Sequence, residues 1–204
     1  MNLKSNAPRR LSALDREELE MNRCIKPRFV RLTKLEAARR HIESAIWIWF
    51  VGDDLASVHV LTAAAHRLLL ELAALREKAA WPYTAAYLSK RTHKDRPARS
   101  QNPVTFFKHA KKKETYEVSE QWTELYLFDA VIAYTSLADD RSASALMSTF
   151  VLRLGVQRQD LFVPDAFSLL ERRVSKTFNL ERLERLSKIE FLKEFIGVLS
   201  KASE

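Results

Sequence analysis

Apolar residues recur every three or four positions along most of the chain, which is the spacing of one face of an α-helix. Two such stripes follow each other, from Thr33 to Val51 and from Asp54 to about Lys78. Thr33 and Glu36 have the Ser/Thr-x-x-Glu spacing of a helix start. Asp53 and Asp54 are expected to cap the second helix, which is a simpler interpretation of two consecutive aspartates than a metal-binding pair. Gly52 is expected to end the first helix. Its core face is predicted to hold Leu35, Ala38, Ile42, Ala45, Ile46 and Trp49, widened by Trp47, Phe50 and Val51 so that most sides are covered.

The same periodicity predicts more helices in the rest of the chain. Proline loses nothing at a first helical position, so Asn102-Pro103 reads as a cap and helix start. Gly155 is expected to end a helix over residues 142–154, and Asn179 is expected to cap a long final helix. The expected ranges are 102–113, 119–137, 142–154, 166–173 and 180–199.

Composition favours helices over strands. The 204 residues include three glycines and six prolines, too few for a turn-rich strand architecture. We therefore predict an all-α, multi-helix bundle. Residues 33–137 are expected to form its central four-helix unit, residues 138–204 to pack on that unit as C-terminal helices, and residues 1–32 to be an N-terminal extension.

The net charge of +8 is unevenly distributed. Residues 84–115 carry nine basic and two acidic side chains, whereas residues 116–204 carry 11 basic and 14 acidic ones. A local excess of positive charge attracts phosphate groups or acidic protein surfaces. We predict that the binding residues are the basic side chains of residues 90–113, which are Lys90, Arg91, Lys94, Arg96, Arg99, Lys108, Lys111, Lys112 and Lys113; a plain solvated loop is the alternative.

Several kinds of chemistry lack their motifs. The glycines are isolated, so no phosphate-binding glycine loop is present, and Cys24 alone makes neither a disulfide nor a cysteine-based zinc site. His59 and His66 lie seven residues apart, about 10 Å along a helix, which favours histidines satisfied in the bundle over metal ligands. The sequence predicts no metal and no cofactor. The longest apolar run, Ala45–Val51, is too short to cross a membrane, so we expect a cytoplasmic protein without a membrane contact.

One acidic residue interrupts an apolar stripe. Asp129 lies one turn after Leu125 in the predicted helix 119–137. A buried carboxylate needs a cationic or hydrogen-bonding partner, which Lys108, His109 or a histidine of the second helix would supply. The favoured interpretation is nevertheless a partly exposed aspartate at the edge of the stripe.

His109 is the candidate catalytic residue. A histidine among cations serves as a general acid or base, and the basic side chains would hold a phosphodiester. Three segments, Asp53–His66, Asn102–Ala110 with its Phe-Phe-Lys-His-Ala pattern, and Leu125–Val131, resemble an uncharacterised group of bacterial all-helical proteins over residues 33–170. A lone histidine in a helical core also resembles, more distantly, the HEPN superfamily, whose nucleases use an Arg-x(4–6)-His motif. The positions of that arginine hold Asn102, Pro103 and Val104 here, and Arg99 lies further upstream.

Three functions therefore stay open. The favoured one is a non-enzymatic binding protein that contacts nucleic acid, such as RNA, or another polyanion or acidic partner through residues 90–113. The second is a HEPN-like, metal-independent ribonuclease using His109 and Arg99. The third is a structural subunit that forms a homodimer through its C-terminal helix.

Overall fold

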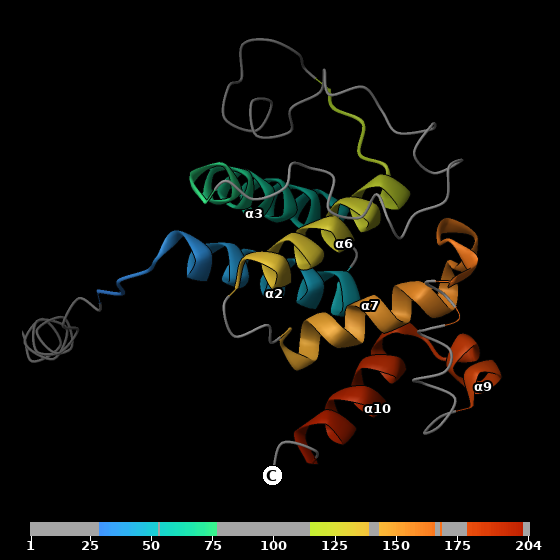
Figure 1. Cartoon of the computed structure of the whole chain (residues 1–204). Coiled ribbons are helices and arrows are strands. Elements are labelled where there is room, and N and C mark those ends of the chain that lie inside the picture. Colours follow the sequence, from blue (N-terminus) through green and yellow to red (C-terminus); the bar gives the residue numbers. More distant parts are fainter. Residues whose placement is uncertain are drawn as a thin grey trace, which may run out of the picture. The chain divides into compact units, whose positions relative to one another are not determined.

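The chain is predominantly helical where its structure is described. The structure is a computed structural model that describes residues 29–52, 54–76, 115–138, 143–165, 168 and 179–201. Contacts divide the chain into two compact units, residues 1–32 and 33–204. The described residues of the second unit form α-helices and a short 3-10 turn, with no β-strand among them (Figure 1). The predicted all-α multi-helix bundle is confirmed. Its division at residue 138 stays a prediction.

The first described helix begins and ends where its sequence signals lie. Helix α2 (Lys34–Val51) starts after Thr33, whose hydroxyl accepts a hydrogen bond from the Glu36 amide at 3.1 Å, and Gly52 follows its last turn. Its predicted covering on most sides is wrong, because Trp47 is 51% exposed and Val51 42%. Both lie on the face that carries the exposed Arg40 and Ser44, whereas Phe50 is buried as expected.

Helix α3 (Leu55–Leu75) runs antiparallel to α2. Asp54 caps it by accepting from the Ser57 amide at 3.0 Å, and Lys34 at the start of α2 pairs with Glu71 near the end of α3. The predicted helix end near residue 78 lies outside the described residues. By length and composition alone, α3 is apolar enough to span a membrane. It packs against both α2 and α6, and its buried residues include Thr62 and His66.

Helix α6 (Glu120–Leu137) runs parallel to α3. The helix starts near Ser119, as predicted, and the Ser119 hydroxyl caps it by accepting a hydrogen bond from the Trp122 amide. Near the starts of the two helices, His59 contacts Thr123. Further along, His66 contacts the Tyr126 carbonyl. At the ends of the helices, Arg76 donates a hydrogen bond to the Leu137 carbonyl. Residues 77–114 therefore join the end of one helix to the start of its parallel neighbour. At 1.5 Å per residue, the two ends are separated by roughly 27 Å along the 18 residues of α6.

Helix α7 (Ala145–Gln157) begins and ends three residues later than the predicted 142–154. Ser144 caps it, and Gly155 lies buried inside the helix rather than ending it. The flanking Leu154 and Val156 are also buried, so packing continues across the glycine and outweighs its weak helix propensity. The 3-10 turn η1 (Gln159–Leu161) follows. Of the predicted helix 166–173, only residue 168 is described.

The predicted long final helix is wrong, because two helices take its place. Asn179 caps α9 (Leu180–Arg185), as expected, and α10 (Lys188–Lys201) starts after a break. At the break, the Ser187 hydroxyl accepts from the Glu190 amide while the Glu190 carboxylate accepts from the Ser187 amide at 2.8 Å, a reciprocal capping box. Arg153 of α7 donates to the carbonyls of Leu183 and Leu186. The chain's apolar period continues through the break, which is why periodicity alone misses it.

An aromatic cluster joins the helices of the core. Trp49 packs edge-on against Phe150 of α7, with ring centroids 5.0 Å apart, and α10 packs on both α7 and α2. Phe191 and Phe195 of α10 are buried, and their rings stack. The first helix and the last are thereby linked through a shared apolar interior.

Candidate functional site

The predicted basic binding residues and the candidate catalytic pair lie outside the described residues. This applies to the expected helix 102–113 and to Lys90, Arg91, Lys94, Arg96, Arg99, Lys108, His109, Lys111, Lys112 and Lys113. Their roles stay predictions. Helix α3 precedes this segment in the chain and helix α6 follows it, and the structure describes both helices.

The exposed basic side chains of α2 and α3 are balanced by carboxylates. Residues 33–76 carry five basic and five acidic residues. Four close ion pairs use these groups, and each has an N···O distance of 2.9 to 3.3 Å: Lys34–Glu71, Arg39–Glu43, Arg40–Glu36 and Arg67–Glu71. These two helices thus add no excess charge to that of residues 84–115.

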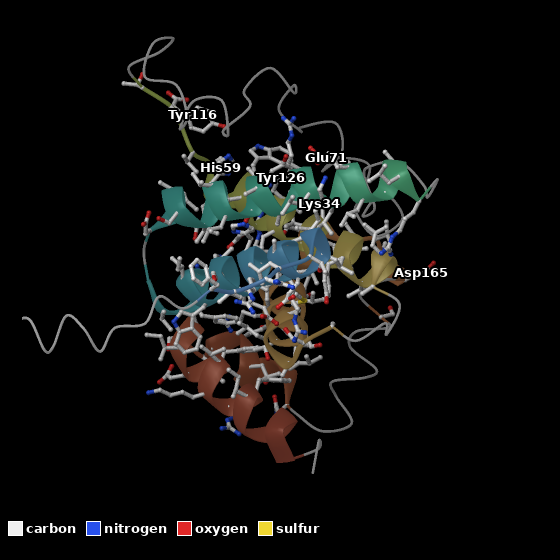
Figure 2. The ribbon with its side chains drawn as sticks, turned by 90° about the vertical axis from the view of Figure 1, so that its left-hand side faces the viewer. Lys34, His59, Glu71, Tyr116, Tyr126 and Asp165 are labelled. Atoms are coloured by element: carbon white, nitrogen blue, oxygen red, sulfur yellow. The ribbon has the colours of Figure 1, made fainter. Side chains whose placement is uncertain are left out.

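His59 connects α3 to the residues that follow the basic segment. Its Nδ1 lies 2.9 Å from the Thr123 hydroxyl oxygen, and its Nε2 lies 3.3 Å from the Tyr116 hydroxyl (Figure 2). Because Thr123 donates its own proton to the Ser119 carbonyl, Nδ1–H is the donor to Thr123. Nε2 then accepts from Tyr116. Burial lowers the pKa of His59, which favours this neutral form.

Asp129 is buried, so the favoured prediction of a partly exposed aspartate is wrong. Its residue is 1% exposed, and its Oδ2 lies 3.6 Å from Nε2 of His66, the second-helix histidine named among the alternatives. The His66 ring stacks on Tyr126 at 4.1 Å between centroids, and its Nε2 lies 2.9 Å from the Tyr126 carbonyl oxygen. His59 stacks at the other end of this row, 6.1 Å from Tyr126. A chain of polar and aromatic contacts therefore fills the seam between α3 and α6.

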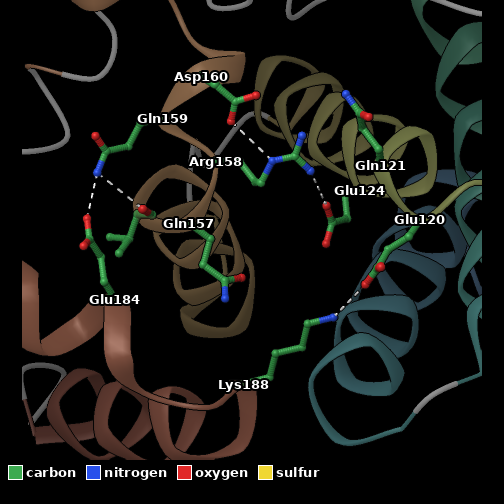
Figure 3. A pocket seen from close by; sticks show the side chains of 10 residues that line it. Glu120, Gln121, Glu124, Gln157, Arg158, Gln159, Asp160, Glu184 and Lys188 are labelled. Atoms are coloured by element: carbon green, nitrogen blue, oxygen red, sulfur yellow. Dashed lines mark hydrogen bonds and ion pairs between the residues drawn. The ribbon is translucent and has the colours of Figure 1, made fainter.

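A polar cavity of about 740 Å³ lies where α6, α7, η1, α9 and the start of α10 meet (Figure 3). Arg158 links its walls, with Nη1 3.6 Å from Glu124 and Nε 3.3 Å from Asp160. Gln159 donates to Glu184 at 2.9 Å, and Lys188 pairs with Glu120 at 3.3 Å. Gln121, Val156 and Gln157 complete the lining.

Glu124 is the buried carboxylate of this cavity. It is 6% exposed, and its Oε1 accepts from the Trp49 indole N–H at 3.0 Å. Burial raises the pKa of Glu124, while the Trp49 hydrogen bond opposes that change. The carboxylate is thus fixed in the wall by the aromatic core.

Sequence reasoning missed this cavity, because three distant segments supply it and its residue types are common on any helix surface. Two nearby signals were readable: Ser187-x-x-Glu190 matches a capping box, and Arg153 lies one turn after Phe150 in an apolar stripe. The first marks the helix break, and the second marks a buried charge of the kind noticed at Asp129.

Neither a metal centre nor a known relative assigns a function to these groups. Among the residues that the structure describes, no three histidine, cysteine or acidic side chains are arranged to hold a metal ion. Comparison of the chain with protein-family models, with curated proteins and with solved structures finds no match. Both family resemblances stay predictions, and the function has to be argued from the residues themselves.

Proposed function

We propose that this chain is a non-enzymatic binding protein that contacts nucleic acid through the basic segment, residues 90–113. The observation that carries the proposal is the concentration of nine basic against two acidic side chains in residues 84–115. Lysine and arginine that neutralise phosphates release counterions, which makes such a segment a sequence-independent source of affinity.

The neighbouring helices support this assignment by contrast. The basic residues of α2 and α3 pair with Glu36, Glu43 and Glu71, and residues 115–138 contain four acidic residues and no basic one. Within residues 33–138, the excess of positive over negative charge is thus confined to residues 84–115. A polyanion is therefore expected to contact that stretch in preference to the helices.

Residues before and after the basic segment are held on the α3–α6 pair by hydrogen bonds. Before it, Arg76 donates to the Leu137 carbonyl; after it, Tyr116 contacts His59. The connection has 38 residues between Arg76 and Thr115. The basic segment therefore lies in the chain between two points that are held on the α3–α6 pair.

The test measures binding of a labelled single-stranded RNA to nucleic-acid-free protein by fluorescence anisotropy. Replacing Lys111, Lys112 and Lys113 with glutamine is expected to weaken binding by tenfold or more at low salt, because three phosphate contacts are lost. The matched control replaces Lys34, Arg39 and Arg40 with glutamine, which removes the same charge from ion-paired positions. This control is expected to change the affinity by less than about threefold.

Two outcomes would contradict the proposal. The first is an equal loss of affinity in both triple variants, which would show that only the total charge matters. The second is RNA cleavage by the wild type that disappears in His109→Ala, which would favour the ribonuclease alternative.

A further inference from the structure

Helix α2 exposes an apolar strip on the side that faces away from its core residues. Trp47 is 51% exposed, and Val51, one turn later, is 42% exposed. The same side of the helix carries the exposed Arg40 and Ser44. Tryptophan is highly buried in most folded proteins, and it is enriched among the residues that anchor protein–protein interfaces. A further surface is therefore expected to cover this strip.

The charges along this strip cancel each other. Arg40 pairs with Glu36 at 2.9 Å, and Arg39 pairs with Glu43 at 3.0 Å. A polyanion needs an excess of positive charge, and a basic partner needs an excess of negative charge, so neither is attracted to this face. The whole chain carries a net charge of +8, so two copies repel each other unless they meet through a neutral face. The neutral α2 strip therefore suits a second copy of the chain.

The strip also matches itself when it is read in the opposite direction. In a symmetric homodimer the same patch of both copies forms the contact, and each pair of contacting residues occurs twice. Two antiparallel α2 helices can be placed with their twofold axis between residues 43 and 44. Trp47 then lies opposite the partner's Arg40, because the two positions are equally far from the axis. A guanidinium group over an indole face is a favourable cation–π contact, and the small, uncharged Ser44 lies beside the axis.

A second exposed apolar pair, on α10, is less suited to such a contact. Ile189 and Ile196 are 44% and 36% exposed and lie two turns apart on one side of the helix. When two antiparallel copies of α10 match these residues, the twofold axis passes beside Lys193, which is exposed between them. The two lysines then face each other, and such a like-charge contact opposes association. This favours α2 over the C-terminal helix as a dimer contact.

We propose that the exposed face of α2, formed by Arg40, Ser44, Trp47 and Val51, is the contact of a symmetric homodimer. The α2 helices of the two copies lie antiparallel, and each Trp47 packs on the partner's Arg40. A single helix pair is smaller than the interface of a stable dimer, so a dissociation constant in about the micromolar range is expected. The contact uses no residue of the basic segment, so it goes beyond the proposed nucleic-acid contact and does not depend on it.

The first test is sedimentation equilibrium of the full chain, free of nucleic acid, from micromolar to submillimolar concentration. The wild type is expected to form dimers, and Trp47→Ser should weaken dimerisation by about tenfold or more, because the interface loses its tryptophan. The matched control is Ile189→Ser, which removes an exposed apolar side chain from α10 and should leave dimerisation unchanged. Equal weakening by both variants, or a wild type that stays monomeric, would overturn the proposal. A monomeric wild type whose RNA affinity falls in Trp47→Ser would assign this face to nucleic acid instead.

The second test locates the twofold axis. Ser44→Cys, made together with Cys24→Ser, is expected to form a disulfide between two copies under mild oxidation, since packed helices are about 8–10 Å apart and position 44 lies beside the axis. Ser136→Cys in the same background is the control, because Ser136 is exposed on α6. Adding Trp47→Ser should lower the crosslinked fraction of the Ser44→Cys variant. Equal crosslinking at positions 44 and 136, or crosslinking that Trp47→Ser leaves unchanged, would contradict the antiparallel α2 contact.

Discussion

Two buried charges are accommodated in different ways in this molecule. In the seam between α3 and α6, Asp129 lies 3.6 Å from a histidine ring, and the surroundings are aromatic and polar. At the corner of α7, α9 and α10, Arg153 is 2% exposed, and no carboxylate among the described residues is within ion-pair distance. Its guanidinium instead donates to the Leu183 and Leu186 carbonyls and lies 4.9 Å from the Phe191 ring centroid.

The difference indicates what each charge does. Arg153 takes up carbonyls that the ending of α9 leaves without helical partners, so a side chain of one helix fixes the break in another segment. Asp129 and His66 instead join two continuous parallel helices. One buried charge therefore organises the path of the chain, whereas the other holds neighbouring helices together.

Removing Arg153 is expected to have the largest effect on stability. Arg153→Ala leaves a cavity and two buried carbonyls without their donor, which should lower the free energy of unfolding by about 3–5 kcal/mol. Urea unfolding followed by circular dichroism measures the change. Arg185→Ala, at an exposed position of α9, is the control and should cost less than about 0.5 kcal/mol. Similar losses in both variants would mean that the corner does not depend on the buried guanidinium.

A smaller effect is expected in the seam. Asp129→Asn keeps the size of the side chain but removes its charge, and the loss should be about 1–3 kcal/mol, since the buried carboxylate charge no longer faces the His66 ring nitrogen 3.6 Å away. Asp165→Asn is the control, because Asp165 is exposed. Thermal unfolding of the two variants side by side gives the comparison. An unchanged stability in Asp129→Asn would show that the seam does not need the carboxylate charge.

The smallest effect is expected for the pH dependence of stability in the seam between α3 and α6. Burial lowers the pKa of His59, so the unfolded chain binds a proton more readily than the folded one. His59 therefore costs stability as pH falls below the ordinary histidine value of 6.5, and this cost is absent above that value. Wild type should lose stability relative to His59→Gln when urea unfolding is repeated from pH 7.5 down to pH 5. A stability difference that does not change with pH would contradict the neutral hydrogen-bonded His59.

The sequence predicts local features of the fold better than the way distant segments meet. The predicted caps at Thr33, Asp54 and Asn179 are confirmed, because a cap depends on residues three positions apart. The predicted single final helix is wrong because the apolar period continues unbroken across the Ser187–Glu190 capping box, where a second helix starts. The burial of Asp129 depends on His66, which is 63 residues away, so periodicity alone favoured the edge of the stripe.

The functional residues divide in the same way. The basic segment is visible as a charge concentration, since charge is a property of composition. The cavity is not visible in this way, because Glu124 of α6, Arg158 at the end of α7 and Lys188 of α10 come from separate segments, and each is ordinary in its own stretch. Only the packing of α6, α7 and α10 brings them together.

The salt dependence of RNA binding tests the central proposal most directly. The logarithm of the association constant should fall linearly with the logarithm of salt concentration, with a slope of about −0.7 for each phosphate contact on a single strand. Replacing Lys111, Lys112 and Lys113 with glutamine is predicted to make the slope less steep by about 2, while the Lys34, Arg39 and Arg40 control keeps the wild-type slope. Binding that does not depend on salt, or an unchanged slope in the Lys111–Lys113 variant, would contradict a nucleic-acid contact through residues 90–113.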